Sequence, residues 1–514
     1  MGEGNIPTRR RGGFLDGVER LGNVLPDPVF IFIGLIVLLA LVSVMGAAQG
    51  WSAINPVTGE TLVAQNLLSA VNVERLLVEM PRTYTGFTPF GLALTIMLGA
   101  TVAERTGLLS ALIRASLLGL SRRVLVPVVF LVGCMTCHSV DAGFLVYVPL
   151  AGLVFAAAGR HPVLGLLVGF AGVSVGLAGN LLPGQIDVLI LAITEVGARL
   201  LVPDYTMNPL GNWWFAAVLT LMCTGLVWII AERVMAPRLG EWTGQGERLN
   251  AGALAPLERR GLVAAGIAAA AVVALFVALT VWPGFTPLYD ESAEGSARMT
   301  PLFRSLSGGV ALLFFASGWA YGAVEGSIRS HRDVVKAMVQ GLEPLLPYIV
   351  LMFFAAHFVA MFGWSNLGPI MAISGAEQLR ALNAPPAVLL PILTTMSAWL
   401  DFLIASASAK WSAVAPVAVP MLMLLDISPE MSTAAYRIGD VVTNLISPMN
   451  PYFVLTLTFC RRWVPEFGQG TMLALMLPLA ASFYLGGMAL TAAWVALDLP
   501  VGPGASVSYS IPAR

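Results

Sequence analysis

Apolar stretches of helical length follow one another along the whole chain, separated by short polar segments. About 20 consecutive apolar residues allow a helix to cross a bilayer. Eleven stretches approach or exceed this length: Pro28–Met45, Phe90–Ile113, Val124–Ala158, Pro162–Val202, Trp213–Met235, Gly261–Trp282, Leu306–Val324, Leu345–Ser374, Ala387–Leu425, Ala434–Phe459 and Met472–Leu497. The pattern therefore predicts an all-α polytopic membrane protein.

Two of the eleven stretches are interrupted by polar residues near their middle. Val124–Ala158 contains the polar run Cys137–Gly143, and Ala387–Leu425 contains Asp401 followed by Ser406–Trp411. Each half has about a dozen apolar residues, which is too short to cross a bilayer alone. We therefore expect two re-entrant hairpins, whose turns must be buried in protein or line a cavity. Nine transmembrane helices remain.

The composition agrees with a membrane protein. Of the 514 residues, 57% are hydrophobic and 11% are charged, whereas soluble proteins carry roughly 25% charged residues. A soluble fold with so few charges could not cover its surface with polar groups. The net charge of −1 and the lack of a dense Lys/Arg block give no indication of nucleic-acid binding.

Basic residues predict the orientation. With residues 1–27 in the cytoplasm, nineteen of the 28 Lys and Arg residues fall on the cytoplasmic side and seven fall outside. Two more, Lys410 and Arg437, lie at membrane depth. This asymmetry is the positive-inside bias of membrane proteins. It predicts a multi-pass protein of the bacterial inner membrane, with the short tail 499–514 on the outer side.

The two hairpins belong to an internal repeat. The first turn, near Ser139, precedes Asn180 and Pro183, and the second, near Ser406, precedes Asn444 and Pro448. Counted along the chain, the separation of the two turns is 267 (406 − 139) and that of the two prolines is 265 (448 − 183). One hairpin enters from the cytoplasm and the other from outside, so the repeat is inverted. Such repeats, with broken helices meeting at the bilayer midplane, are typical of secondary transporters.

The repeat also predicts the organisation of the chain. The first inverted repeat covers residues 28–235 with hairpin 1 at about 124–158, and the second covers 303–498 with hairpin 2 at about 387–425. Residues 236–302 form a linker region that includes the fifth span.

Arg437 and Asp440 are the most informative charged residues in the apolar stretches. They are three residues apart, so they share one helical face and can pair. Charged side chains at this depth cost several kcal/mol to insert and usually face a functional cavity. The guanidinium of Arg437 can bind an anionic substrate group through two parallel hydrogen bonds, with Asp440 holding it in place or exchanging a proton. The alternative is a structural ion pair that pins two helices.

Proline residues interrupt the helices in which the other polar residues lie. Pro448 and Pro451 must break helical hydrogen bonding and expose backbone groups. Pro183 does the same in the first repeat, where Asp187 follows one turn later. We expect Asp187 to act in the site, together with Asp440 as a second candidate for proton coupling. The alternative is a carboxylate satisfied by a neighbouring helix end.

These residues resemble, in type and spacing, the site residues of the AbgT family, which includes importers of p-aminobenzoyl-glutamate and exporters of sulfonamide antimetabolites. The resemblance covers essentially the whole chain. It implies a homodimer with a scaffold of inner helices and a mobile outer core that carries both hairpins. It also implies substrate-binding roles for seven residues, namely Asp187, Ser408, Trp411, Pro429, Arg437, Asp440 and Pro448. Trp411 would then stack on an aromatic ring of the substrate.

Sodium coupling is a separate question. The hairpin turns and the broken helices offer hard oxygen ligands that suit a small cation, at Ser139, Asp141, Asn180, Ser406, Ser408 and Asn444. Buried polar tips also need partners for purely structural reasons. The run from Cys134 to His138 matches the c-type haem pattern, but it lies in an apolar segment that enters from the cytoplasm. We expect no haem, no zinc and no other cofactor.

The sequence thus predicts a proton- or sodium-coupled secondary transporter of aromatic carboxylates or sulfonamides, moving by an elevator-like mechanism. A sodium/dicarboxylate symporter of similar architecture is an alternative, and so is a passive channel. An intramembrane aspartyl protease using Asp187 and Asp440 is an alternative of a different class, although a protease has no need of the repeat. The direction of transport and the choice between proton and sodium stay open.

Overall fold

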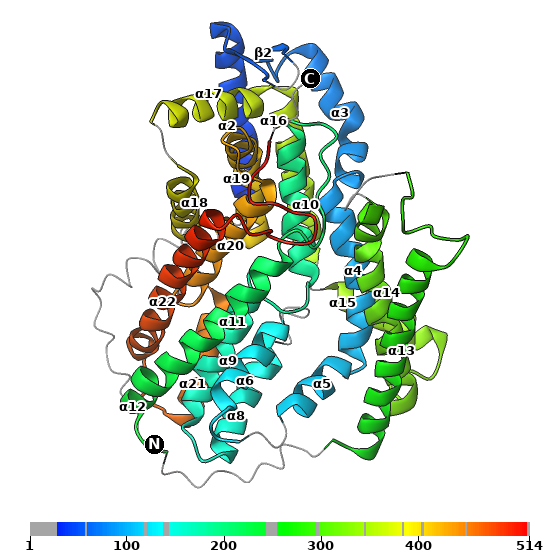
Figure 1. The fold of residues 1–514 in the computed structure, drawn as a ribbon, viewed down its shortest axis with the longest axis vertical. Helices are drawn as coiled ribbons and strands as arrows, with labels where there is room; N and C mark the ends of the chain where they lie inside the picture. The colour runs from blue at the N-terminus through cyan, green and yellow to red at the C-terminus, as the bar shows by residue number, and fades with distance from the viewer. Residues whose placement is uncertain are drawn as a thin grey trace, which may run out of the picture.

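The computed structural model describes residues 28–56, 59–117, 121–136, 143–242, 254–292, 298–343, 346–382, 385–401, 406–447 and 450–510. The described chain is mostly helical (Figure 1). Its elements are α2 Pro28–Gln49, β1 Ser52–Ile54, β2 Thr61–Val63, α3 Ala70–Thr85, α4 Thr88–Arg105, α5 Leu108–Leu117, α6 Leu125–Met135, the π-helix η2 Gly143–Tyr147, α8 Val148–Ala157, α9 Pro162–Gly176, α10 Gln185–Arg199, α11 Trp213–Ile230, the π-helix η3 Ala231–Met235, α12 Ala236–Leu239, α13 Pro256–Val281, α14 Thr300–Glu325, α15 His331–Leu342, α16 Leu346–Trp364, α17 Leu367–Ala381, α18 Pro386–Asp401, α19 Ala407–Met423, α20 Pro429–Asn444, α21 Pro451–Trp463 and α22 Gln469–Ala496.

Six of the described helices are long and apolar enough to cross a membrane. They are Val29–Gln49, Trp213–Leu239, Pro256–Val281, Arg304–Glu325, Leu346–Trp364 and Gln469–Ala496. Four shorter apolar helices, Leu125–Met135, Gly143–Ala157, Pro162–Gly176 and Pro386–Asp401, belong to the predicted hairpins and broken helices. A multi-pass membrane protein is therefore confirmed in outline.

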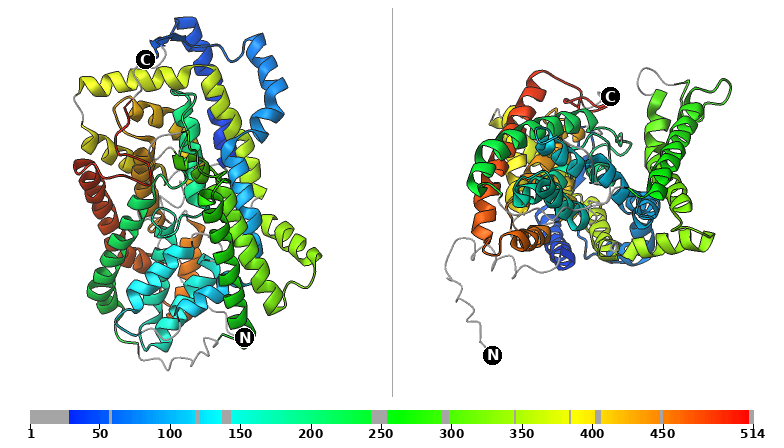
Figure 2. Two further views of the ribbon diagram at one scale, coloured as in Figure 1. Left: turned by 45° about the vertical axis from the view of Figure 1, so that its right-hand side comes forward. Right: turned by 90° about the horizontal axis from the view of Figure 1, so that it is seen from below.

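Most of the described helices pack around the two largest apolar cores. The larger core joins the helices of both predicted hairpins and both broken helices with α11 and α22. The smaller core joins α2, α16 and the start of α17. A third group, α13 and α14, stands apart from this body in the view from below in Figure 2 and packs on it through α4. Most of the α13 surface is exposed, as expected for a helix that faces lipid or another protein.

The helices of the two repeats recur at an almost constant spacing. In each predicted hairpin the first helix is α6 or α18, and the last residues of these two helices differ by 266 in number (401 − 135). The second helix of each hairpin is α8 or α19, and their last residues also differ by 266 (423 − 157). The broken helices follow the same rule, because the starts of α9 and α20 differ by 267 (429 − 162) and those of α10 and α21 by 266 (451 − 185). The predicted breaks are present between α9 and α10 and between α20 and α21.

Two apolar stretches that we predicted as single spans are each two helices. Phe90–Ile113 is divided between α4 and α5 by Gly107, which has a left-handed φ of 83°. Leu345–Ser374 is divided between α16 and α17 by Asn366, with a φ of 57°. Left-handed backbone ends a helix without changing the hydropathy of the segment. The all-α prediction also missed the short antiparallel pair β1–β2.

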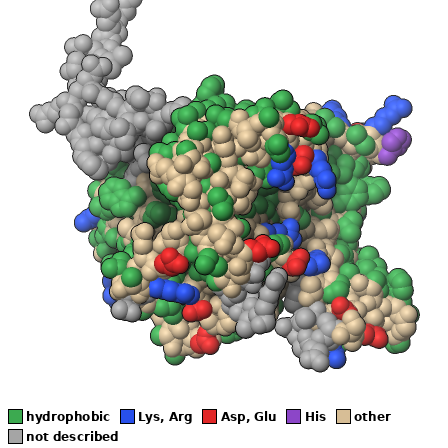
Figure 3. All heavy atoms as spheres, turned by 90° about the horizontal axis from the view of Figure 1, so that it is seen from above, with side chains coloured by type: hydrophobic (Ala, Val, Ile, Leu, Met, Phe, Trp, Pro, Cys, Tyr) green, Lys and Arg blue, Asp and Glu red, His purple; other side chains and the backbone are tan. Residues whose placement is uncertain are grey.

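The C-terminal tail after α22 packs on both repeats. The carbonyl of Val501 accepts a hydrogen bond from the amide of Phe215 in α11 at 3.1 Å. The carbonyl of Val507 accepts one from Ser428, just before α20, at 2.9 Å. Seen along the long axis in Figure 3, hydrophobic side chains reach the rim of the molecule and charged side chains form small scattered groups.

Candidate substrate-binding site

Helix α20 carries the site, and every one of its residues is buried. It begins with Pro429 at a position that needs no backbone N–H, and the Ser428 side chain caps it by accepting a hydrogen bond from the Met431 amide. Arg437 and Asp440 are each only 3% exposed. Charges buried to this degree must be paired, and the partners come from other helices.

Arg437 pairs with Asp187 of the other repeat. Its Nη2 lies 2.6 Å from Asp187 Oδ1 and donates a hydrogen bond to the carbonyl of Leu177 at 2.7 Å. Leu177 is the C-terminal cap of α9, where carbonyl groups lack helical partners and carry partial negative charge. The guanidinium therefore binds the break between α9 and α10 as well as the carboxylate behind it.

Asp187 is held by the start of α10. Its Oδ2 accepts hydrogen bonds from the Gly184 amide at 2.6 Å and from Asn180 Nδ2 at 2.8 Å. A carboxylate in the first turn of a helix is stabilised by the free amides and the helix dipole. Asn180, a predicted sodium ligand, thus contacts Asp187 through its amide nitrogen. Its Oδ1 is buried and has no hydrogen-bond partner in the described residues.

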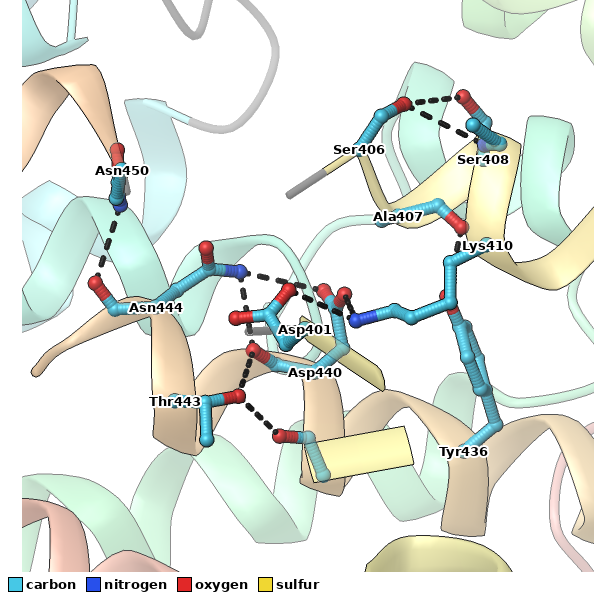
Figure 4. A network of polar contacts seen from close by, with 12 residues as sticks. Asp401, Ser406, Ala407, Ser408, Lys410, Tyr436, Asp440, Thr443, Asn444 and Asn450 are labelled. Atoms are coloured by element: carbon cyan, nitrogen blue, oxygen red, sulfur yellow. Dashed lines mark hydrogen bonds and ion pairs between the residues drawn. The ribbon is translucent and has the colours of Figure 1, made fainter. Parts of the chain in front are cut away.

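The predicted pair between Arg437 and Asp440 is wrong: no ion pair joins them in the described chain. Asp440 instead lies 2.7 Å from the Nζ atom of Lys410. The same ammonium donates to Asp401 Oδ1 at 2.8 Å, as Figure 4 shows. Helical spacing placed Arg437 and Asp440 on one face of the helix. It could not show that each would pair more favourably with a residue on a neighbouring helix than with the other. The cluster therefore has five charged side chains: Asp187, Asp401, Lys410, Arg437 and Asp440. Its net charge is −1 when all five are ionised.

Arg437 keeps two donors unused. Its Nε and Nη1 atoms are buried and have no hydrogen-bond partner in the described residues. Unsatisfied buried donors are rare in native proteins and call for an explanation. A carboxylate or sulfonyl group could accept hydrogen bonds from these N–H groups, in addition to those that Nη2 makes with Asp187 and Leu177.

Trp411 is completely buried in this conformation. Its ring stacks on Tyr436 with centroids 4.2 Å apart, and its indole N–H donates to Thr194 Oγ1 at 2.7 Å. Thr194 Oγ1 lies in turn 2.7 Å from Thr433 Oγ1. Trp411 therefore joins α10, α19 and α20, and stacking on a substrate requires a conformation in which the indole becomes accessible.

The remaining predicted residues fall in different places. Ser406 caps α19 and lies 3.4 Å from Ser408, oxygen to oxygen, and Asn444 donates to the Asp440 carbonyl at the end of α20. Pro429 begins α20, eight residues and roughly 12 Å before Arg437, so it lies outside the charged cluster. Pro448, Ser139, Asp141, Cys137 and His138 lie outside the described residues.

Sequence reasoning missed Asp401 and Lys410 as site residues. Both stood in the second hairpin at membrane depth, and two unmatched charges there were a signal, because such charges pair with one another. Tyr436 and Thr194 gave no signal that separates them from ordinary core residues. The described residues contain no group of three or more metal-ligating side chains, and Cys134 is buried.

Comparison with known families decides what this arrangement belongs to. The sequence profile of the AbgT transporter family matches residues 13–509. The chain belongs to the AbgT family. It is also 34% identical to the p-aminobenzoyl-glutamate transport protein of Escherichia coli (strain K12) over 508 residues, which is 98% of this chain and 99% of that protein.

Solved structures of AbgT transporters have the same fold. The Alcanivorax borkumensis YdaH transporter superposes with a TM-score of 0.86 at 40% identity, covering 93% of this chain and 100% of that chain. Neisseria gonorrhoeae MtrF, described as one of a class of antimetabolite efflux pumps, superposes with a TM-score of 0.88 at 37% identity, covering 96% and 100%. The AbgT resemblance of the sequence is thus confirmed, and the relatives are transporters and not enzymes.

Proposed function

We propose that this protein is a secondary active transporter of aromatic carboxylates of the p-aminobenzoyl-glutamate type, or an exporter of sulfonamide-type antimetabolites. The names of its AbgT relatives support both substrate classes. The observation that carries the proposal is the pair of unused, buried donors on Arg437. Both substrate classes offer acceptor oxygens to which these N–H groups can donate.

Substrate binding in this proposal uses the charged cluster and its surroundings. Arg437 receives the carboxylate or sulfonyl oxygens, and Asp187 keeps the guanidinium in position. Trp411 and Ser408 contact the rest of the substrate when the second hairpin opens, and Pro429 and Pro448 shape the two ends of the broken helix. The burial of the cluster in this conformation agrees with alternating access, in which a site is closed on at least one side.

The architecture proposed for the chain has nine transmembrane helices and two opposed re-entrant hairpins. Six long helices, the two broken pairs α9–α10 and α20–α21, and α4 supply the nine. The repeats at 28–235 and 303–498, joined by 236–302, are supported by the constant spacing of their helices. Residues 1–27 face the cytoplasm, and the tail 499–514 faces outward.

Impermeant labelling of single cysteines at Ser139 and Ser408, on a cysteine-free background, tests this topology. We expect the first turn to react only from the cytoplasm and the second only from outside. Labelling of both turns from one side would rule out the inverted repeat.

Movement in the proposal is elevator-like and occurs within a homodimer. The larger apolar core contains both hairpins and both broken helices, so it can move as one body against α2, α16 and the α13–α14 group. The exposed apolar groove of about 400 Å³ between α13 and α14 suits contact with lipid or a second copy.

The coupling ion is proposed to be a proton or sodium. Asp187 and Asp440 are the proton candidates, and the oxygen groups of Ser139, Asp141, Asn180, Ser406, Ser408 and Asn444 are the sodium candidates. Uptake of p-aminobenzoyl-glutamate into proteoliposomes, with pH and sodium gradients imposed independently, tests transport and coupling together. Absence of uptake of both p-aminobenzoyl-glutamate and a sulfonamide under every gradient would contradict the function.

A sodium/dicarboxylate symporter remains a second transport hypothesis, which competition with a non-aromatic dicarboxylate would reveal. The protease alternative has little support. An aspartyl protease needs two carboxylates that share one proton, whereas Asp187 and Asp440 each pair with a different basic residue.

A further inference from the structure

The second hairpin holds a cation of its own. Lys410 Nζ lies 2.8 Å from Asp401 Oδ1 and 2.7 Å from Asp440 Oδ1, and the three residues come from α19, α18 and α20. The exposed fractions of their side chains are 0%, 1% and 5%. Figure 4 shows the ammonium pointing between the two carboxylates.

This arrangement is what a bound metal cation would otherwise require. Two carboxylates from different helices converge on one point, where hard oxygen ligands would hold a small cation. Asp401 is the last residue of α18, so the negative end of that helix dipole adds to the attraction. The ammonium occupies this point and is covalently tethered to the hairpin, so it cannot leave.

The surroundings supply no competing charge. Tyr436 presents its ring to the ammonium at 5.7 Å, and Arg437, one turn before Asp440, points to Asp187. Helix α22, which packs on α18 and α20, contains no charged residue in Gln469–Ala496. The cation requirement of Asp401 and Asp440 is therefore met by Lys410 alone among the described residues.

The described residues of the first repeat contain no such arrangement. The spacing between the helices of the two repeats matches Asp401 with Met135, Lys410 with Phe144, and Asp440 with Val173 or Ser174. None of these counterparts carries a charge. Among the described residues, the tethered ammonium and its two carboxylates therefore occur only in the second repeat.

We propose that Lys410 is a built-in cation that takes the place of a metal ion in the second repeat. It ties the hairpin to α20 and excludes sodium from the second repeat. This narrows the sodium candidates of the proposed function to those of the first repeat and removes Ser406, Ser408 and Asn444 from the set. This inference deepens the proposed function, because it names the cation that Asp401 and Asp440 bind. Only the part of the inference that concerns transport rests on the proposed function. Lys410 is in this sense a positioning residue.

A purely structural salt bridge makes a different prediction. If Lys410 only pins two helices, its removal lowers stability equally in every salt. If its ammonium replaces a metal ion, its removal leaves two converging carboxylates that bind sodium. The readout that separates the two is a sodium-specific change in stability, which needs no transport assay.

The test compares thermal unfolding of detergent-purified protein in sodium chloride and in choline chloride at equal ionic strength. In the unmodified protein, we expect sodium binding at the second repeat to make no contribution to the melting temperature. In Lys410→Met, we expect saturating sodium to raise the melting temperature by about 3 °C or more. The matched control is Lys336→Met, the same change at the exposed lysine of α15, which should show no sodium response. A folded Lys410→Met that ignores sodium would overturn the proposal.

Two further variants keep the test decisive if Lys410→Met does not fold. Lys410→Met with Asp401→Asn leaves one carboxylate and should still respond to sodium, more weakly. The triple variant that also carries Asp440→Asn has no buried charge at this place and should fold without a response. Failure of the two-residue variant to respond, when folded, would count against the proposal.

The unmodified protein gives a second decisive outcome. If sodium stabilises it and Asn180→Ala abolishes the effect, sodium binds in the first repeat and the proposal stands. If Asn444→Ala or Ser406→Ala abolishes the effect, the second repeat binds sodium and the proposal is wrong. Failure of proteoliposome uptake would affect the transport function and leave these stability results unchanged.

Discussion

Helices α9 and α20 occupy equivalent places in the two repeats and have opposite chemical content. Both are wholly buried, over 15 residues in α9 and 16 in α20. Helix α9 contains no charged residue, whereas α20 contains Glu430, Arg437 and Asp440. The same position in the fold thus serves packing in one repeat and charge chemistry in the other.

The packing function is nevertheless common to both helices. Gly172 of α9 and Gly439 of α20 are equivalent positions, because their numbers differ by the repeat spacing of 267 (439 − 172). Each lies against the backbone of the first helix of the predicted hairpin in its own repeat: Gly172 against Phe130 of α6, and Gly439 against Thr394 of α18. The repeats therefore share their close helix contacts and differ in what the rest of each helix carries. The same close helix contact is thus compatible with a helix that carries charges and with one that carries none.

The two repeats meet chemically at the pair between Asp187 and Arg437, and breaking it should have the largest effect. Asp187→Asn leaves a buried guanidinium without its counter-ion, and we expect a loss of about 3–5 kcal/mol in stability. The double variant Asp187→Ala with Arg437→Ala should recover much of this loss, because both buried charges are gone, but should not bind substrate. Thermal unfolding of the purified protein measures the first effect and ligand binding the second.

The control for this pair is the partly exposed ion pair of Arg160 and Glu232, 2.7 Å apart. Glu232→Gln should cost no more than about 1 kcal/mol. Near-normal substrate transport by the Asp187/Arg437 double variant would remove both residues from the substrate site.

Substitution of Arg437 by Lys sharpens the chemical side of the comparison. An ammonium keeps the charge opposite Asp187 but cannot offer the planar fork. Loss of a charge-assisted contact of about 1.5–3 kcal/mol lowers affinity roughly ten- to a hundred-fold. Equilibrium binding of p-aminobenzoyl-glutamate, normalised to folded protein, measures this, with Arg160→Lys as the control. Unchanged affinity in Arg437→Lys would mean that the fork does not hold the substrate.

The two glycines test the shared packing. A Cβ at Gly172 or Gly439 would clash with a backbone carbonyl oxygen of the neighbouring helix, and overpacking of this kind costs about 1–3 kcal/mol. We expect Gly172→Ala and Gly439→Ala to destabilise the protein by similar amounts in thermal unfolding. Gly225→Ala, in α11 with nothing near the added carbon, should be neutral or slightly stabilising. A tolerant Gly172 beside an intolerant Gly439 would show that the repeats pack differently.

Trp411→Phe should have the smallest effect. The substitution keeps an aromatic ring against Tyr436 and removes the hydrogen bond to Thr194, so about 1 kcal/mol of stability should be lost. Thermal unfolding and substrate binding are measured side by side. A large loss of affinity with unchanged stability would assign Trp411 to the substrate instead of the helix contacts seen in this conformation.

Hydropathy and proline positions predicted most of the architecture. The helix breaks between α9 and α10 and between α20 and α21 lie where the prolines placed them, because proline interrupts helical hydrogen bonding. The divisions at Gly107 and Asn366 escaped prediction, because one left-handed residue changes the direction of a chain without changing its hydropathy. The identities of Arg437, Asp440 and Asp187 as deeply buried charges were also readable, from the cost of placing them there.

The sequence by itself determined that buried charges must find partners, and the tertiary structure decided which partners they found. Arg437 and Asp440 share a helical face, yet Arg437 pairs with Asp187 in the other repeat, and Asp440 pairs with Lys410 on the second hairpin helix. The reason is physical: within a helix the local geometry is fixed by sequence spacing. The strength of a buried ion pair depends instead on distance, orientation and desolvation, which only the packing of separate helices sets.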